Sequence, residues 1–282
     1  MFDHPDDFET SRKIVENSGE FQEVFDTVDD LIDFYDNVIN FFPVNSATII
    51  AKEGSFNLST HLISSVKFTL NSIKKCLEYR AMTDAFTLLR KKRDDLFLYL
   101  YILEVANNNP AGMEDLPDKQ NKHIKDVFDW KNNELKDLYI SDISKYLRNN
   151  PKIDKVLENH DLMDFYWEIY ELLNDCVHTN GIKYARYNYT NELNKIDLEV
   201  ASSNFHFSIK YISLLFVTFL ILIKPYLISS YDHLHYLEEG IEPPPDSQYW
   251  VSPYVREFID NYIHDFDDRL KKFLDEETYM DI

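Results

Sequence analysis

The sequence predicts an all-α protein, a helical bundle with one long apolar helix at its centre. Three observations lead to this prediction. The 282-residue chain has only 5 glycines, so tight turns are scarce. Apolar residues recur at spacings of three and four along several segments, as on one face of a helix. Tyr211–Ile223 carries no charge and is shorter than the about 20 residues that span a bilayer, which favours a buried core helix over a membrane span.

The first expected elements follow each other with short interruptions. Residues 1–18 are expected to form an acidic, flexible arm. Glu20–Phe42 has helical spacing of its apolar residues, and Pro43 ends it. The periodic pattern then extends over Asn57–Ala106, which begins with several N-cap residues. Because this stretch is long for one helix, we expect two, with a break near Arg80–Thr83.

The second half of the chain alternates helical patterns with breaks that contain Asn, Pro or Gly. Asn107–Gln120 is expected to be a loop. Lys183–Leu198 alternates weakly and is the candidate for a strand or hairpin, and Gly181 stands where it can cap the helix before it. Helices are expected over five stretches: Lys122–Leu147, Lys152–Leu157, Leu162–Thr179, Phe205–Leu237 and Pro253–Phe273.

These elements predict a simple domain organisation. A helical bundle occupies residues 19–238. A rigid linker rich in proline covers residues 239–252 and includes the sequence Glu-Pro-Pro-Pro-Asp over 242–246. An acidic, amphipathic C-terminal helix within residues 253–282 follows this proline tether.

The composition is strongly acidic, with 50 acidic against 29 basic residues and a net charge of −21. Such a chain repels free nucleic acid on average. Most of the acidity lies towards the two ends, whereas Asn57–Glu104 is mildly basic. The two cysteines are too few for a disulfide framework or a structural zinc site, and the first residues do not form a signal peptide, so we expect a cytoplasmic protein.

A cluster of polar residues closes the aromatic helix of the second half. Glu171, Asn174, Asp175 and His178 are three or four residues apart, so they lie on one side of that helix. A carboxylate can orient His178 and raise its pKa, which suits a proton-transfer group. A satisfied structural histidine fits the same pattern, and the two interpretations remain open. Asn180 follows directly and can support either arrangement.

Two arginines form the second candidate. Arg93 falls within the apolar stripe of its helix, and Arg90 lies three residues earlier on the same side. An unpaired buried guanidinium is unfavourable. Arg93 therefore either extends to the rim, where Asp94 or Asp95 can pair with it, or faces the cluster around His178 across two packed helices. No metal site and no cofactor are expected, because ligand spacings and nucleotide-binding loops are missing.

Two short motifs carry a resemblance. Residues 85–94 read Ala-Phe-Thr-Leu-Leu-Arg-Lys-Lys-Arg-Asp, and residues 172–181 read Leu-Leu-Asn-Asp-Cys-Val-His-Thr-Asn-Gly. This pair resembles the HEPN superfamily of helical bundles, in particular a bacterial branch found among defence and toxin-like genes. The resemblance covers about residues 57–237.

The resemblance implies a site as well as a fold. Catalytic members of the superfamily look like metal-independent ribonucleases built on Arg-Asn-x-x-x-His. Asn174 and His178 match the last two positions, whereas Leu173 stands in the place of the arginine. A catalytic version would use His178 as general acid or base, Asn174 to position the phosphate and Arg90 or Arg93 to hold it. The resemblance also implies a homodimer.

Three functional interpretations follow. The first is a HEPN-like, metal-independent endoribonuclease of the defence or toxin type, acting on RNA. The second is a non-catalytic interaction module whose acidic ends bind a protein partner that is basic or that itself binds nucleic acid. In the third and least favoured, the apolar stretch over residues 211–230 attaches the protein to a membrane.

Overall fold

The computed structural model of the chain describes these residues: 19–42, 46–52, 54–109, 118–182, 184, 187, 195–230, 235–236, 238–241, 251–278 and 282. The predicted arm over residues 1–18 lies outside them. So do Pro43, most of the predicted linker over 239–252 and most of the candidate strand over 183–198.

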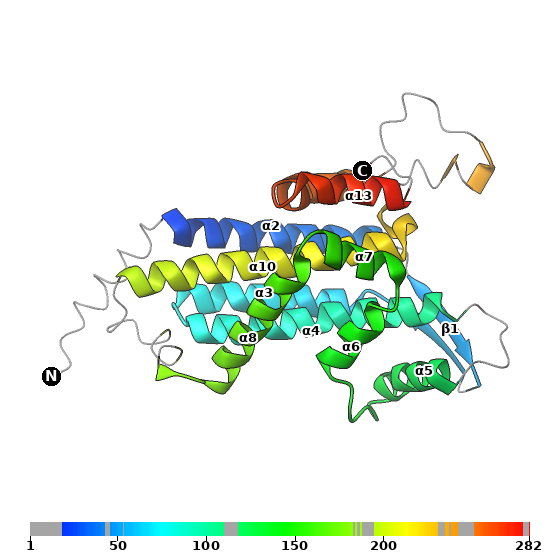
Figure 1. Cartoon of the computed structure of the whole chain (residues 1–282), viewed down its shortest axis with the longest axis horizontal. Helices are drawn as coiled ribbons and strands as arrows, with labels where there is room; N and C mark the ends of the chain where they lie inside the picture. The colour runs from blue at the N-terminus through cyan, green and yellow to red at the C-terminus, as the bar shows by residue number, and fades with distance from the viewer. Residues whose placement is uncertain are drawn as a thin grey trace. The chain divides into compact units, whose positions relative to one another are not determined.

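The predicted all-α class is confirmed, since helices and one small hairpin make up the described chain (Figure 1). A short 3₁₀ turn, η1 (Pro225–Ile228), and a π-helical turn, η2 (Ile259–His264), accompany the α-helices. The α-helices of the described residues are α2 (Gly19–Phe41), α3 (His61–Glu78), α4 (Met82–Asn107), α5 (Asp118–Lys131), α6 (Ile140–Leu147), α7 (Pro151–Asn159), α8 (Leu162–His178), α10 (Lys195–Ile223), α12 (Pro253–Phe258) and α13 (Asp268–Thr278).

The chain divides into two compact units, and the boundaries fall within α2, α3, α4, α8 and α10. Unit 1 draws on the stretches Met1–Asp36, Ser64–Arg93 and Met163–Ser213. Unit 2 draws on the stretches Asn37–Ile63, Asp94–Leu162 and Leu214–Ile282.

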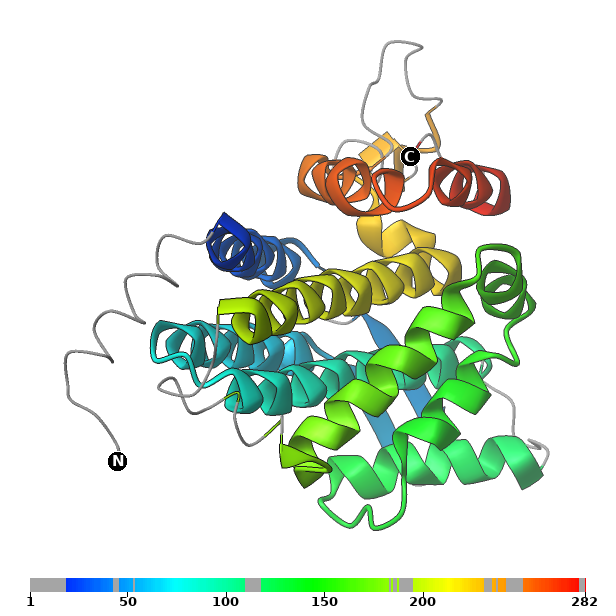
Figure 2. The ribbon, with the colours of Figure 1, turned by 60° about the vertical axis from the view of Figure 1, so that its left-hand side comes forward.

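Unit 1 is a bundle in which its parts of α2, α3, α4 and α10 run side by side while α8 lies obliquely across them (Figures 1 and 2). Aromatic contacts join the layers. The ring centroids of Phe86 on α4 and Phe205 on α10 are 5.1 Å apart. Those of Phe165 on α8 and Phe207 on α10 are 5.5 Å apart. Phe86 and Phe205 are fully buried, and a large apolar side chain buried in this way contributes about 1.5–3 kcal/mol.

The predicted break between two helices near Arg80 is confirmed. Arg80 has a left-handed backbone with φ of 57°. Its N–H donates to the carbonyl of Leu77 at 2.9 Å, and the N–H of Ala81 donates to the carbonyl of Cys76 at 2.8 Å. This pair of bonds is the Schellman ending of a helix, which satisfies the last carbonyls of α3 and reverses the chain into α4.

The long apolar helix α10 differs from the prediction at both ends. It begins at Lys195, ten residues before the predicted start, so residues 195–198 are helical and the predicted strand is wrong there. It ends at Ile223 instead of Leu237, because Pro225 has no N–H and cannot continue the helix.

The apolar character of α10 is explained by where it lies. By length and composition Glu199–Ile223 is able to cross a membrane, but 83% of its most apolar 18-residue window is buried inside the protein. Helices at the core of globular proteins have the same composition. A single helix of this kind is therefore weak support for a membrane attachment.

Unit 2 contains a hairpin that the sequence analysis did not predict. Strand β1 (Ala47–Ala51) pairs antiparallel with β2 (Gly54–Leu58), with Ile49 opposite Phe56. The hairpin lies beside α5 (Figure 2), where the rings of Phe56 and Trp130 are 6.2 Å apart. Strands of five residues give too short an alternation to stand out from a neighbouring helical pattern.

The predicted helix over Lys122–Leu147 is wrong, because it is two helices, α5 and α6, separated by residues 132–139. Asn133 has a left-handed backbone with φ of 61°, and the N–H of Glu134 donates to the carbonyl of Asp129 at 2.7 Å. Asparagine tolerates this conformation better than most residues, so it ends α5 where a glycine often stands.

The interruption before α7 links that helix to α4 within unit 2. Asn150 is the N-cap of α7, and its side-chain oxygen accepts from the N–H of Lys152 at 3.0 Å. Its amide group donates to Glu104 at 3.2 Å. Glu104 is 4% exposed and also accepts from Asn108 at 3.1 Å. Burial raises the pKa of the Glu104 carboxyl, while these two amides oppose the rise.

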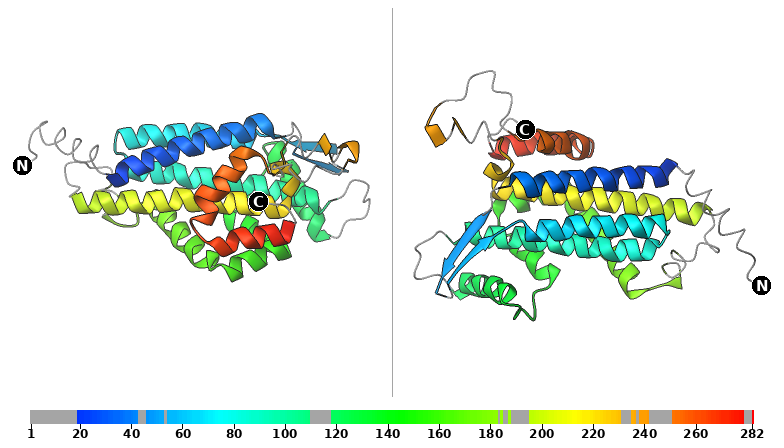
Figure 3. Two further views of the ribbon diagram at one scale, coloured as in Figure 1. Left: turned by 90° about the horizontal axis from the view of Figure 1, so that it is seen from above. Right: turned by 180° about the vertical axis from the view of Figure 1, so that it is seen from behind.

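The predicted single helix over Pro253–Phe273 is wrong, because α12 continues into the π-helical turn η2 and a separate helix, α13, begins at Asp268 and extends to Thr278 (Figure 3). This segment packs on α7 within unit 2. Nδ1 of His160 lies 2.9 Å from the carboxylate of Asp267. Nζ of Lys155 donates to Glu277 at 2.6 Å.

Candidate functional site

Two contacts fix how α4 and α8 pair inside unit 1. The guanidinium of Arg93 lies over the ring of Tyr170, 5.1 Å from its centroid. Ten residues earlier on α4, the hydroxyl of Thr83 donates to the carbonyl of Tyr184, which follows the end of α8. The two segments are therefore antiparallel. With a rise of about 1.5 Å per residue, this register places Arg90 roughly level with Asn174.

Arg93 itself is enclosed in the protein. It lies in the buried stripe of α4 with Leu89 and Leu96, and its exposed fraction is 1%. Arg90, one turn earlier, is half-buried. A side chain as enclosed as Arg93 cannot touch a substrate on the surface, so its contact with Tyr170 joins two helices.

The middle of α8 turns inward. Leu173, which stands where the resemblance expects an arginine, is fully buried. Asn174 is half-buried, and its side-chain oxygen is enclosed without a hydrogen bond from the described residues. An enclosed carbonyl oxygen without a donor is unfavourable.

His178 lies elsewhere, on the surface at the last residue of α8. Within the part of the chain that the structure describes, it makes no hydrogen bond or ion pair. The carboxylate of Asp175 accepts instead from the amide of Asn180 at 3.0 Å and from the hydroxyl of Tyr184 at 2.9 Å. Glu171 is exposed and one turn further back. This differs from the carboxylate-backed histidine that the spacing suggested.

Asp175, Asn180 and Tyr184 belong to the ending of α8. Burial, together with the hydrogen bond to Asp175, raises the pKa of Tyr184 to about 12. The predicted cap, Gly181, does not have a left-handed backbone. Thr179 does, with φ of 49°, and the N–H of Asn180 donates to the carbonyl of Asp175 at 3.0 Å. The left-handed residue thus lies two positions before the predicted cap, in a Schellman ending.

The structure also contains a buried amine that the sequence analysis did not single out. Lys92 is fully buried, and its Nζ donates to the hydroxyl of Ser213 at 2.6 Å and lies 5.4 Å from the ring centroid of Tyr35. Burial lowers the pKa of Lys92 to about 7. The signal is weak in sequence, because Lys92 stands inside a run of four basic residues over 90–93 that reads as a solvated face.

A basic amine beside a serine hydroxyl can act as a nucleophilic pair in hydrolases. Here Lys92, Ser213 and Tyr35 are all 0% exposed, so no substrate reaches them. Among the described residues, no group of three or more histidines, cysteines or carboxylates is arranged to hold a metal ion.

The outer face of α2 carries a row of acidic side chains in unit 1. Four exposed acidic side chains follow one another there at spacings of three and four, and we call them the acidic row: Glu23, Asp26, Asp30 and Asp33. Two further acids of α2 turn towards α3. Asp29 pairs with Lys74 at 2.5 Å, and Asp36 pairs with Lys67.

Comparison with known proteins adds no relative. No protein-family model matches the chain, and no curated protein or solved structure is detectably similar to it.

Proposed function

We propose that this protein is a non-catalytic interaction module that binds a protein partner with a basic surface. The observation that carries the proposal is the acidic row on the outer face of α2. Its four carboxylates span about 15 Å of one helix face. A row of one charge attracts and orients a surface of the opposite charge.

The placement of the other polar residues supports the same proposal. Arg93 is enclosed against Tyr170, and Leu173 fills the arginine position of the ribonuclease motif with a buried apolar side chain. Asp175 is engaged by Asn180 and Tyr184. These groups therefore fix the register and the end of α8, a role well known for buried polar residues.

The experiment compares two variants with the same change in net charge. The row variant carries Glu23→Gln, Asp26→Asn, Asp30→Asn and Asp33→Asn. The control variant neutralises four exposed acids of unit 2: Glu158→Gln, Glu257→Gln, Asp265→Asn and Glu276→Gln. Binding of a fluorescein-labelled nona-lysine peptide is measured by anisotropy at physiological salt. The row variant should bind about tenfold more weakly, and the control should bind like the wild type. Equal loss in both variants would mean that net charge alone acts, and would contradict the proposal.

A second function, the HEPN-like metal-independent endoribonuclease, is favoured by one specific arrangement. His178 is exposed at the end of α8, and the antiparallel register places the half-buried Arg90 roughly level with Asn174. In this version His178 acts as general acid or base and Arg90 supplies charge for a phosphate. It requires RNA cleavage that persists in EDTA and depends on His178.

A further inference from the structure

The outer face of α3, together with Tyr79 directly after its last residue, carries two strongly exposed aromatic rings in unit 1. Phe68 is 73% exposed and Tyr79 is 77% exposed. With Ser72 and Lys75 they follow one another at spacings of four, three and four, so they share one side of α3. We call these four residues the aromatic face. Its two rings are about 16 Å apart along the helix axis.

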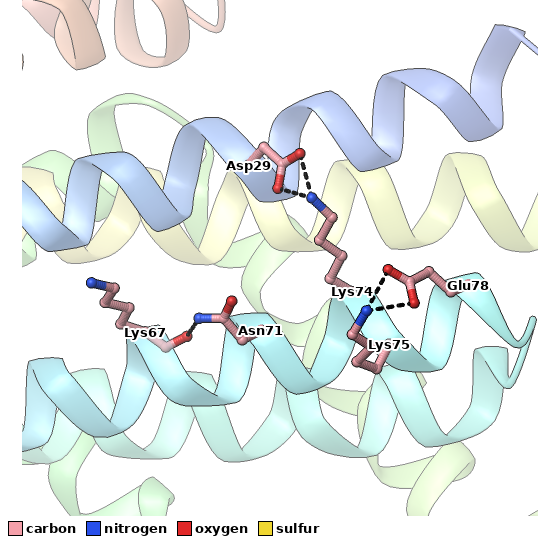
Figure 4. Close-up of polar contacts among 6 residues, drawn as sticks. All are labelled: Asp29, Lys67, Asn71, Lys74, Lys75 and Glu78. Atoms are coloured by element: carbon pink, nitrogen blue, oxygen red, sulfur yellow. Dashed lines mark hydrogen bonds and ion pairs between the residues drawn. The ribbon is translucent and has the colours of Figure 1, made fainter.

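The aromatic face lies next to the acidic row. Lys74 of α3 reaches Asp29 of α2 at 2.5 Å (Figure 4), and Lys67 reaches Asp36. As the residue numbers of the lysines rise along α3, those of their aspartate partners fall along α2. The two helices are therefore antiparallel neighbours. By this register Tyr79 is level with the Glu23 end of the acidic row, and Phe68 is level with its Asp33 end.

The lysines between the rings do not oppose a cationic partner. Figure 4 shows Lys74 held by Asp29, and Lys75 held by Glu78 at 2.7 Å. Each ammonium is thus neutralised by a carboxylate of the same surface. The acidic row lies beside them on the outer side of α2, so this surface carries more carboxylates than amines.

From this juxtaposition we propose that the acidic row and the aromatic face together bind an arginine-rich segment of a partner protein. The inference rests on the proposed function and names the chemistry of its partner. The planar guanidinium of arginine stacks on aromatic rings and also forms bidentate pairs with carboxylates. The ammonium of lysine pairs with carboxylates as a point charge and stacks less well. Exposed rings flanked by carboxylates therefore select arginine over lysine.

The test uses two fluorescein-labelled peptides of equal charge, nona-arginine and nona-lysine, with the whole protein. The wild type should bind nona-arginine more tightly than nona-lysine. The variant Phe68→Ala with Tyr79→Ala should bind nona-arginine about tenfold more weakly and lose much less affinity for nona-lysine, because each exposed ring makes a cation–π contact that arginine uses better than lysine. Tyr139→Ala removes a ring that is 64% exposed elsewhere, and should change neither peptide.

The outcomes separate this inference from the function on which it rests. If the row variant binds both peptides more weakly and the ring variant binds both like the wild type, the acidic row binds cations without selecting arginine. The inference about arginine then fails, and the proposed function stands. If the row variant and its charge control bind both peptides equally well, both proposals fail. Sedimentation velocity gives the remaining outcome, since a wild-type dimer that dissociates in the ring variant would assign the aromatic face to a second copy of the chain.

Discussion

The guanidinium of Arg93 lies over the ring of Tyr170 and joins α4 to α8 in the interior of unit 1. Its exposed fraction is 1%, and it belongs to the buried stripe of α4 that also contains Leu89 and Leu96. Groups of this kind are stable only while their surroundings stay in place. The arginine thus acts on the register between two helices.

Removing Arg93 should therefore reduce stability much more than removing His178. We expect Arg93→Ala to lower the free energy of unfolding by about 3 kcal/mol. The substitution deletes a packed side chain and leaves the polar groups around it buried without a partner. His178→Ala, at an exposed site, should change it by less than about 0.5 kcal/mol. Urea denaturation measures both. A fully stable Arg93→Ala protein would mean that the contact with Tyr170 does not hold the helices.

Lys92 should destabilise the folded protein at neutral pH and below. Burial lowers its pKa to about 7, whereas the unfolded chain keeps the ordinary value of 10.5. The penalty of a buried charge is present below pH 7 and is relieved as the pH rises from 7 towards 10.5. We expect Lys92→Met to stabilise the protein by about 2–4 kcal/mol at pH 6.

The pH dependence provides the control for Lys92. The advantage of Lys92→Met should shrink between pH 7 and pH 10, because the wild-type amine is neutral there. Lys91→Met, which changes an exposed neighbour, should alter the free energy of unfolding by less than about 0.5 kcal/mol at either pH. An advantage that does not depend on pH would show that packing, and not charge, sets the difference.

Thr179 should be a point of backbone strain. Its φ of 49° is left-handed, and a β-branched residue is rarely found there. Thr179→Gly should raise the free energy of unfolding by about 0.5–1 kcal/mol, the strain relieved being partly offset by the greater freedom of glycine in the unfolded chain. Thr179→Ala keeps a Cβ and should show little gain. Thermal unfolding of the two variants separates them, and equal gains would point to the threonine side chain instead of the backbone.

Asp267 should make the stability of unit 2 depend on acid. Burial alone would raise its pKa, but hydrogen bonds from Arg269 and His160 outweigh burial and lower the pKa from 3.8 to about 2. A depressed carboxyl pKa stabilises the fold above the unfolded value, and this stability is lost as the pH falls from about 4 to about 2.

We therefore expect Asp267→Asn to lower the free energy of unfolding by about 1–2 kcal/mol at pH 7. The difference from the wild type should narrow below pH 4. Guanidinium denaturation over this range measures it, with the exposed neighbour variant Asp265→Asn as the control. A difference that stays constant down to pH 2.5 would assign it to lost packing around His160.

The sequence predicts the helices better than their ends. The helix over α2 and the break at Arg80 follow from apolar spacing and from the length of the pattern. The wrong boundaries come from residues whose signals are shared with other structures. Asn133 ends α5 with a left-handed turn, but an asparagine within a polar stretch does not stand out in the sequence as a helix end. Thr179 ends α8, although Gly181 is the obvious candidate in the sequence.

The candidate site is predicted less well than the helices, because its geometry depends on packing that sequence patterns do not report. Helical spacing predicts that Glu171, Asn174, Asp175 and His178 lie on one side of α8, but it says nothing about how deeply each is buried or which partner each contacts. Depth depends on which helix covers that face, and that is a tertiary property. The contact of Arg93 with Tyr170 therefore emerges only from the packing of α4 against α8.

We propose that this helical protein binds a partner and does not cleave RNA. The most direct measurement is cleavage of total cellular RNA by the purified protein in EDTA, with wild type and His178→Ala side by side. We predict no difference between them and no fragments above the background of a protein-free reaction. RNA fragments that appear with the wild type and disappear with a folded His178→Ala protein would contradict the account and establish a metal-independent ribonuclease.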